Sequence, residues 1–234
     1  VVRQQNAGLD QYLESIANPH HHAAGLRKSD LASMPRLSAL MSAGATRIIT
    51  MDLHADQIQG FFEVPVDHLY ASTIFVPYLK SLNLDNITIA SPDMGGSKRA
   101  YAYSKFLDCE VVICYKQRKK ANVIEYMELI GEVKNRNVII VDDMVDTAGT
   151  LAKAAELMME RGAKSVRALA THGILSNNAY EKIENSPLIE LIITDSIPLK
   201  RTSSKIKVVT CAPLFASVMK SVQNNQSIGD QFLI

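Results

Sequence analysis

VIIVDDMVDTAGTL, residues 138–151, joins the end of a buried strand to a loop of small residues and the first turn of a helix. The Val and Ile run is apolar on both faces, so we expect a strand buried between two layers that ends at Asp142 and Asp143. Residues 150–161 then carry apolar side chains at helical spacing, and Gly162 stands at the position of a helix C-cap. A strand that leads through a short loop into a helix is typical of parallel α/β folds.

The same alternation extends outward on both sides of this unit. Six more Val- and Ile-rich runs are predicted to be strands, namely 47–51, 87–91, 111–115, 166–171, 189–194 and 206–210. The buried face of the helix at 150–161 is expected to consist of Leu151, Ala154, Ala155 and Met158. Another helical pattern spans residues 213–222. The predicted fold class is therefore α/β, with parallel sheets flanked by helices.

Composition limits the class of protein. The 234 residues are 47% hydrophobic, and 25 Lys and Arg balance 24 Asp and Glu to leave a net charge of +1. Proteins that bind nucleic acid or membrane surfaces usually carry a basic excess, so neither partner is expected. No apolar run approaches the roughly 18 residues of a membrane span, and the first residues do not resemble a signal peptide. Cys109, Cys114 and Cys211 lie in apolar runs without CxxC spacing, so we expect buried, reduced thiols and a cytoplasmic protein.

Residues 142–150 have the composition of a site for phosphate and sugar. The segment carries three carboxylates, on Asp142, Asp143 and Asp146. It also carries small and hydroxyl residues, namely Thr147, Ala148, Gly149 and Thr150. Free N–H groups and the positive dipole end of the following helix attract a phosphate, and Gly149 lets the backbone approach it. The carboxylates would repel that phosphate unless they bind sugar hydroxyls or a divalent cation. Helix capping explains one Asp and one Thr, but not three Asp and two Thr in nine positions.

Three further segments place polar residues directly after predicted strands. They are MDLHADQIQGFF (51–62) with His54, SPDMGGSKR (91–99) with Asp93, and CYKQRKKANVIEYMELIGEV (114–133) with Lys116 and Arg118. Taken singly, each has an ordinary structural explanation, since strand-end histidines, turn aspartates and solvated charge runs are common.

Together, in this order and spacing, these segments resemble the ribose-phosphate pyrophosphokinases. The loop at 142–150 resembles the phosphoribosyl-pyrophosphate motif that this family shares with phosphoribosyltransferases. With LATHGILS (169–176) and TDSIP (194–198), the resemblance covers about 190 of the 234 residues, which is far more specific than one glycine-rich loop. It implies attack by the anomeric hydroxyl of ribose 5-phosphate on the β-phosphorus of ATP, with AMP as the leaving group.

The resemblance also implies roles for individual residues. Lys116 and Arg118 are expected to be catalytic on a loop that covers the transferring phosphates, and Arg118 also to contact substrate. His54 and Asp93 are expected at the sites of the Mg²⁺ cofactor. Ribose 5-phosphate is expected to bind Asp142, Asp143, Asp146, Thr147, Ala148, Gly149 and Thr150.

The first third of the chain departs from the family. Residues 1–32 show no clean periodicity, and Arg3-Gln4 lies farther upstream of His54 than the family places its Arg-Gln-Asp loop for adenine. We therefore assign no adenine site to residues 1–40, which leaves ATP binding by this polypeptide open. Three adjacent His at 20–22 cannot all face one ion from a regular element, so a loop or an artificial sequence feature is favoured over a metal site.

The expected organisation has three parts. Residues 1–70 form a partial N-terminal phosphoribosyltransferase-like domain, 71–212 a second such domain with the ribose 5-phosphate loop, and 213–234 a helix and tail that pack back on the first domain. The family implies ATP and ribose 5-phosphate as substrates, assembly as a homodimer or homohexamer, and regulation by ADP or phosphate. Two alternatives stay open. A non-catalytic regulatory relative would fit the atypical N-terminal third, whereas a phosphoribosyltransferase would have no use for the motifs at 51–62 and 91–99.

Overall fold

The structure, a computed structural model, describes residues 41–117 and 126–229. The chain divides into two compact units, one that ends at Leu69 and one that begins at Tyr70. Each unit contains its own β-sheet. The predictions for residues 1–40, including the His run, and for the tail from residue 230 lie outside the described residues.

The smaller unit is built on two parallel strands. β1 (Ile48–Met51) and β2 (Val66–Leu69) align from Ile48↔Val66 to Met51↔Leu69. The 3-10 helix η1 (Asp56–Phe61) lies between them in the chain and buries Ile58. β2 is not among the predicted strands, because VDHL mixes polar and apolar residues and lacks the Val and Ile run of the other strands.

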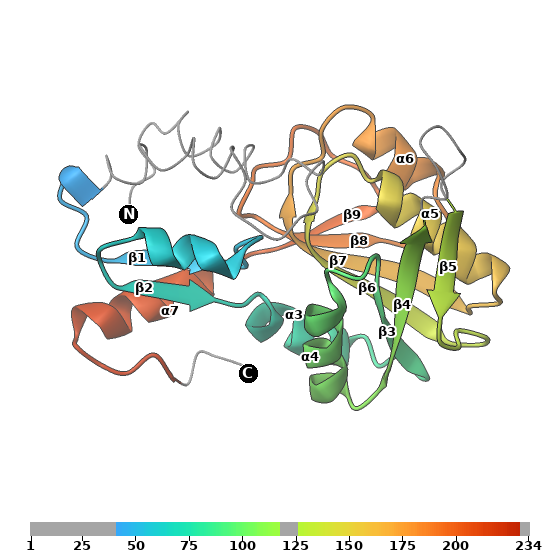
Figure 1. Ribbon diagram of the computed structural model, residues 1–234, viewed down its shortest axis with the longest axis horizontal. Coiled ribbons are helices and arrows are strands. Elements are labelled where there is room, and N and C mark those ends of the chain that lie inside the picture. Colours follow the sequence, from blue (N-terminus) through green and yellow to red (C-terminus); the bar gives the residue numbers. More distant parts are fainter. Residues whose placement is uncertain (1–40, 118–125, 230–234) are drawn as a thin grey trace. The chain divides into compact units, whose positions relative to one another are not determined.

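The larger unit contains a mixed sheet of seven strands (Figure 1). The strands are β3 (Ile87–Ser91), β4 (Glu110–Gln117), β5 (Tyr126–Ile130), β6 (Asn137–Val145), β7 (Ser165–Gly173), β8 (Leu191–Thr194) and β9 (Ile206–Val209). The helices are α3 (Ser72–Ser81), α4 (Ser97–Leu107), α5 (Gly149–Glu160), α6 (Ala179–Asn185) and α7 (Ala212–Gln223). The spatial order is β5-β4-β3-β6-β7-β8-β9, and only β5 runs antiparallel to its neighbour. The predicted α/β class with a parallel-dominated sheet is confirmed.

The central strand β6 is buried on both faces, as its uninterrupted Val and Ile run predicts. Val138 and Ile140 are fully buried in one apolar cluster with Leu151 and Met158 of α5. Ile139 is fully buried on the opposite face, the side that α4 covers in contact with β3, β4 and β6 (Figure 1). Alternate residues of a strand point to opposite faces, so this pattern fixes which helix each β6 side chain meets.

β6 runs beyond its predicted end. Met144 and Val145 still pair with His172 and Gly173 of β7, so the strand ends at Val145 and not at Asp143. The reason is the neighbouring strand, which is itself longer than the predicted run at 166–171 and keeps β6 extended.

The helix after β6 follows the predicted pattern. Its face of Leu151, Ala154, Ala155 and Met158 is at most 5% exposed. Gly162, which follows the C-cap Arg161, adopts φ +86°. The N–H of Gly162 donates to the Met159 carbonyl and that of Ala163 to the Met158 carbonyl, each at 3.0 Å. This is the Schellman arrangement, in which a left-handed glycine closes the last turn.

The cysteines are free thiols, as expected. Cys114 and Cys211 are buried, whereas Cys109 is only partly buried. Burial raises the pKa of both Cys114 and Cys211 to about 12, and for Cys211 a hydrogen bond to Asp195 adds to the effect. These two thiols are therefore poor nucleophiles at neutral pH.

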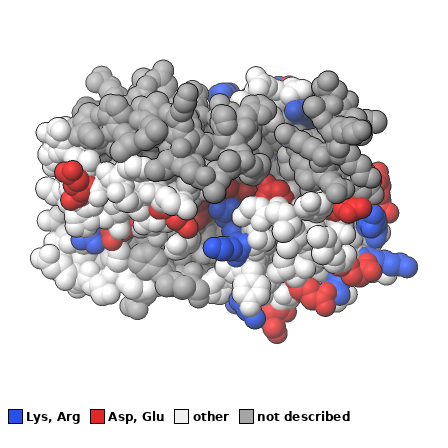
Figure 2. All heavy atoms as spheres, in the orientation of Figure 1, with Lys and Arg blue, Asp and Glu red and all other residues white. Residues whose placement is uncertain are grey.

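On the face drawn in Figure 2, Lys and Arg side chains lie next to Asp and Glu side chains, and neither sign forms a large patch of its own. Within residues 41–117 and 126–229, no helix is long and apolar enough to span a membrane.

Candidate functional site

Two aspartates near the carboxyl end of β6 form the centre of the candidate site. Asp142 follows Val138 and Ile140 on the face toward α5, whereas Asp143 follows Ile139 on the face toward α4. The N–H of Asp143 donates to Oδ1 of Asp142 at 2.9 Å. The two carboxylates therefore have different surroundings although they are adjacent in sequence.

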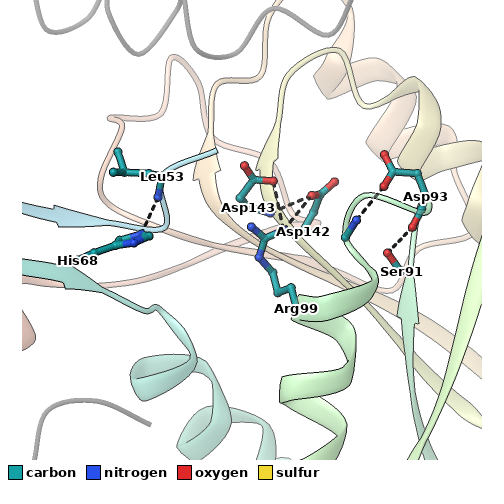
Figure 3. A network of polar contacts seen from close by, with 8 residues as sticks. Leu53, His68, Ser91, Asp93, Arg99, Asp142 and Asp143 are labelled. Carbon is teal, nitrogen blue, oxygen red and sulfur yellow. Dashed lines mark hydrogen bonds and ion pairs between the residues drawn. The ribbon is translucent and has the colours of Figure 1, made fainter. Parts of the chain in front are cut away.

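Arg99, in the first turn of α4, compensates part of this negative charge. Its Nη1 lies 3.3 Å from Oδ1 of Asp143 and 3.6 Å from Oδ1 of Asp142 (Figure 3). Asp143 is only 4% exposed, so the ion pair provides the partner that a buried carboxylate requires. Asp142 remains more accessible than Asp143 and makes the longer contact.

The pKa of Asp142 is raised well above its usual range. Burial is the largest cause, followed by the negative charge of Asp143, and Arg99 offsets only part of the effect. The charge of Asp93, in the turn after β3, raises the pKa further, so its carboxylate acts on the same site. A cation, or the hydroxyls of a sugar as hydrogen-bond donors, would stabilise the ionised form.

Asp93 is held in a tight turn between β3 and α4. Its Oδ1 accepts the N–H of Gly96 at 3.0 Å, and its carbonyl accepts the Ser91 hydroxyl at 2.6 Å (Figure 3). A Cβ at position 96 would lie 2.7 Å from Oγ of Ser91, so the turn requires glycine there. The turn therefore fixes one carboxylate oxygen of Asp93 at the carboxyl edge of the sheet.

The loop between β6 and α5 presents an uncapped helix N-terminus. No side chain caps α5, and its first turn contains no acidic residue. The hydroxyls of Thr147 and Thr150 make no hydrogen bond to any residue that the structure describes. Free N–H groups, the positive dipole end and two available hydroxyls together form a site for an anion.

The unusual backbone of this loop is at Ala148 and not at Gly149. Ala148 adopts φ 57° and ψ 7°, a left-handed conformation that a non-glycine residue seldom adopts. Gly149 has no positive φ, and a Cβ there would come no nearer than 3.6 Å to another residue. Ala148 therefore makes the reversal of the chain, and the role of Gly149 in a close approach to the phosphate stays a prediction.

Residues that follow β7 form hydrogen bonds to the loop between β6 and α5. The Ser176 hydroxyl donates to Oδ1 of Asp146, and the Ser176 N–H donates to the Asp146 carbonyl at 3.0 Å. Lys182 of α6 donates from Nζ to the Thr147 carbonyl at 3.1 Å. Ser176 and Lys182 are not among the predicted site residues, since no local pattern in the sequence links residues 30 or more positions apart.

The smaller unit holds the second group of predicted residues. His54 lies exposed in the bend after β1. The preceding Leu53 donates its N–H to Nε2 of His68 at 3.0 Å, and His68 is only 7% exposed (Figure 3). On the other side of the ring, Nδ1 of His68 lies 3.1 Å from Nε2 of Gln59 and 3.7 Å from the Asp56 carboxylate. β2 therefore anchors the bend that carries His54.

The remaining predicted residues are less completely described. Lys116 belongs to β4 and is paired with Met127 of β5, and Arg118 lies outside the described residues. His54 and Asp93 belong to different units. In the described part of the chain, no group of three or more His, Cys, Asp or Glu could hold a metal ion by itself. Magnesium at phosphate sites is usually held by one or two carboxylates together with substrate phosphates. The negative charges of Asp93 and Asp142 act on one another, and such carboxylates are suited to a magnesium ion of this kind.

Comparisons with known proteins agree with this arrangement. Residues 103–233 match the family model described as the phosphoribosyl synthetase-associated domain. The ribose-phosphate pyrophosphokinase of Wolinella succinogenes is 51% identical, over 89% of this chain and 70% of the relative. That of Porphyromonas gingivalis is 50% identical, over 87% of this chain and 68% of the relative.

A solved structure extends the agreement to three dimensions. The phosphoribosylpyrophosphate synthetase from Mycobacterium smegmatis superposes with a TM-score of 0.78 at 31% identity, and the match covers 92% of this chain and 69% of that one. Sequence and structure thus point to the same relatives over most of the chain. The protein belongs to the ribose-phosphate pyrophosphokinase family, a family of enzymes that transfer diphosphate groups.

Proposed function

We propose that this chain transfers the pyrophosphoryl group of ATP to the anomeric hydroxyl of ribose 5-phosphate, giving 5-phosphoribosyl 1-pyrophosphate and AMP. The anomeric oxygen forms a bond to the β-phosphorus, the bond between that phosphorus and the oxygen of the AMP phosphate breaks, and the hydroxyl proton passes to solvent. This chemistry asks the protein mainly to position the reactants and to neutralise negative charge.

The loop between β6 and α5 is the proposed site of ribose 5-phosphate. Its uncapped N–H groups and the hydroxyls of Thr147 and Thr150 would bind the 5-phosphate. Asp142 and Asp146 would accept hydrogen bonds from the ribose hydroxyls. Asp143, already engaged by Arg99, would orient that arginine and Asp142 more than it would contact the sugar. The single observation that carries the proposal is this pairing of an anion-binding helix end with aspartates.

His54 is proposed to serve the site of the magnesium–ATP complex, and Asp93 the site of the metal bound to the product phosphates. Each ion would neutralise phosphate charge, and the ion on ATP would polarise the transferred group. Lys116 and Arg118 are proposed to stabilise the charge that spreads over the phosphates during transfer. The family relationship supports these roles.

The deciding experiment follows AMP release from Mg²⁺ and ATP with and without ribose 5-phosphate. Sugar-dependent AMP formation is expected, with 5-phosphoribosyl 1-pyrophosphate in equal amount. Lys116→Ala should lower kcat by a factor that corresponds to roughly 3–4 kcal/mol of barrier while ribose 5-phosphate still binds. Unchanged turnover in that variant would refute the catalytic assignment.

The same assay separates the alternatives. Ribose 5-phosphate binding without AMP release would favour a regulatory relative, for which the partner would be an active synthetase chain. Release of pyrophosphate from 5-phosphoribosyl 1-pyrophosphate in the presence of a nucleobase would instead indicate a phosphoribosyltransferase. We further propose a cytoplasmic homodimer or homohexamer, which sedimentation in the presence of Mg²⁺ and phosphate would test.

A further inference from the structure

We propose that Lys182 of α6 is an additional residue of the ribose 5-phosphate site, which positions the phosphate loop and supplies positive charge behind it. The inference rests on the proposed function of the loop between β6 and α5. It adds a residue from a separate element, 35 positions after Thr147 in the chain.

The ammonium of Lys182 lies directly against the loop. Its Nζ donates to the Thr147 carbonyl at 3.1 Å. It is also the nearest atom to the position of a Cβ on Gly149, at 3.6 Å. An ammonium carries three N–H donors, and one of them accounts for the recorded bond. The positive charge therefore lies beside the two peptide units that begin α5.

The charge of Lys182 has no carboxylate partner among the residues that the structure describes. Two other cations of the larger unit are paired: Arg167 lies 3.0 Å from Glu190 and Arg201 2.6 Å from Glu181. Lys182 is half-buried and bonds instead to a neutral carbonyl. An uncompensated, partly desolvated cation next to a proposed phosphate site contributes to anion binding more strongly than a solvated surface charge.

The bond also orients the loop. The Thr147 carbonyl and the Ala148 N–H belong to one trans peptide unit, in which the two groups point in opposite directions. Because Lys182 binds the carbonyl, the Ala148 N–H points away from Lys182. Ala148 has the left-handed backbone of the loop, a conformation that needs support from its surroundings. Lys182 thus acts on the peptide unit that leads into the reversal.

The position of Lys182 is itself fixed. α6 is anchored in the core by Ala179 and Ile183, both fully buried. The chain before α6 is tied to the loop, because the N–H groups of Ile174 and Leu175 both donate to the Val145 carbonyl, at 3.0 and 3.1 Å. With the two bonds from Ser176 to Asp146, α6 and the loop form one connected structure.

The test is calorimetric titration of the whole chain with ribose 5-phosphate at low and high salt. Lys182→Met should weaken binding about tenfold at low salt, which corresponds to about 1.4 kcal/mol. Lys182→Arg should restore most of the affinity. Lys182→Gln keeps a donor for the Thr147 carbonyl but loses the charge, so it should bind nearly as weakly as the Met variant. The differences should shrink at high salt because ions screen the charge.

Lys164→Met is the matched control. It removes one positive charge from the same unit, at the exposed pair with Asp85, and should leave the affinity unchanged. If the unchanged chain binds ribose 5-phosphate and the Lys182→Met and Lys164→Met variants bind it equally well, the proposed role of Lys182 is overturned but the proposed function is not. Absence of binding by the unchanged chain would overturn the proposed function as well. Full affinity in the Lys182→Gln variant would overturn the proposed contribution of the positive charge and leave only the hydrogen bond to the Thr147 carbonyl.

Discussion

Asp142 shows at the scale of one residue how a site can be prepared at the expense of stability. Its carboxylate is partly buried beside Asp143, and both the partial loss of solvent and that neighbouring charge oppose ionisation. The folded pKa is therefore above the unfolded one, so this group stabilises the folded state most at low pH, and that contribution is lost as the pH rises through the raised value. In its ionised form this carboxylate can accept hydrogen bonds from a sugar or bind a cation, and without them its charge is unfavourable in the folded state.

Asp142→Asn should therefore stabilise the free protein. At pH 7.5 we expect the Tm to rise by roughly 2–4 °C, which for a chain of this size corresponds to about 1 kcal/mol. The gain should vanish below about pH 4, where the wild-type carboxyl is protonated in both states. Calorimetric melting across this pH range tests the sign, and sugar-dependent AMP release should be lost in the same variant.

Asp143→Asn is the matched comparison with the opposite expectation. It leaves the Arg99 guanidinium without its nearest carboxylate, so we expect a loss of roughly 1–3 kcal/mol in the free energy of unfolding. Equal melting shifts for the two asparagine variants would show that the two carboxylates do not differ as described.

His68 illustrates a structural histidine beside a proposed functional one. Because its Nε2 accepts the N–H of Leu53, the neutral ring must carry its proton on Nδ1. His68→Leu leaves the Leu53 N–H without its acceptor and should lower the free energy of unfolding by roughly 1–3 kcal/mol. His68→Gln offers a side-chain oxygen as acceptor in place of Nε2 and should recover part of the lost free energy of unfolding. Urea unfolding measures both, and a Leu variant as stable as wild type would contradict this role.

At the scale of elements, the turn between β3 and α4 depends on one glycine. Gly96→Ala would place a Cβ 2.7 Å from the Ser91 hydroxyl, which itself holds the Asp93 carbonyl. We expect a loss of roughly 1–3 kcal/mol from this overpacking and weaker Mg²⁺-dependent turnover because Asp93 shifts. Gly96→Ala in combination with Ser91→Ala removes the clashing oxygen and should recover stability. If the double variant is no more stable than Gly96→Ala, the clash is not the cause.

Elements with one dominant pattern could be predicted from the sequence. The buried run of β6 and the helical spacing of α5 specify their own structures, because each repeats a single period over many residues. β2 was missed because VDHL has no such run, and the end of β6 was misplaced because β7 determines it. The aspartates and threonines of the site were identifiable by chemical type. Their supports, Ser176 and Lys182, were not, because they reach the loop only through the tertiary fold.

At the scale of the whole molecule, the proposed ribose 5-phosphate site lies entirely within the larger unit. Hydrogen exchange should therefore show slower exchange on addition of ribose 5-phosphate at residues 142–151 and 174–182. Residues 48–69 of the smaller unit should not change until Mg²⁺ and ATP are added. Mass spectrometry of peptic fragments measures this. Equal protection of both units by ribose 5-phosphate alone would contradict a site confined to one of them.

The strand order also has a consequence for the chain as it is being made. β3 lies between β4 and β6, and β6 follows it in the chain only after about 45 residues, which at about 5–20 residues per second take several seconds to synthesise. Throughout that interval the side of β3 that later meets β6 presents unpaired N–H and C=O groups, and an exposed strand edge of this kind can pair with another nascent chain. The strand order that places Asp93 and Asp142 at the carboxyl ends of neighbouring strands therefore also exposes the chain to misassembly during its synthesis on the ribosome.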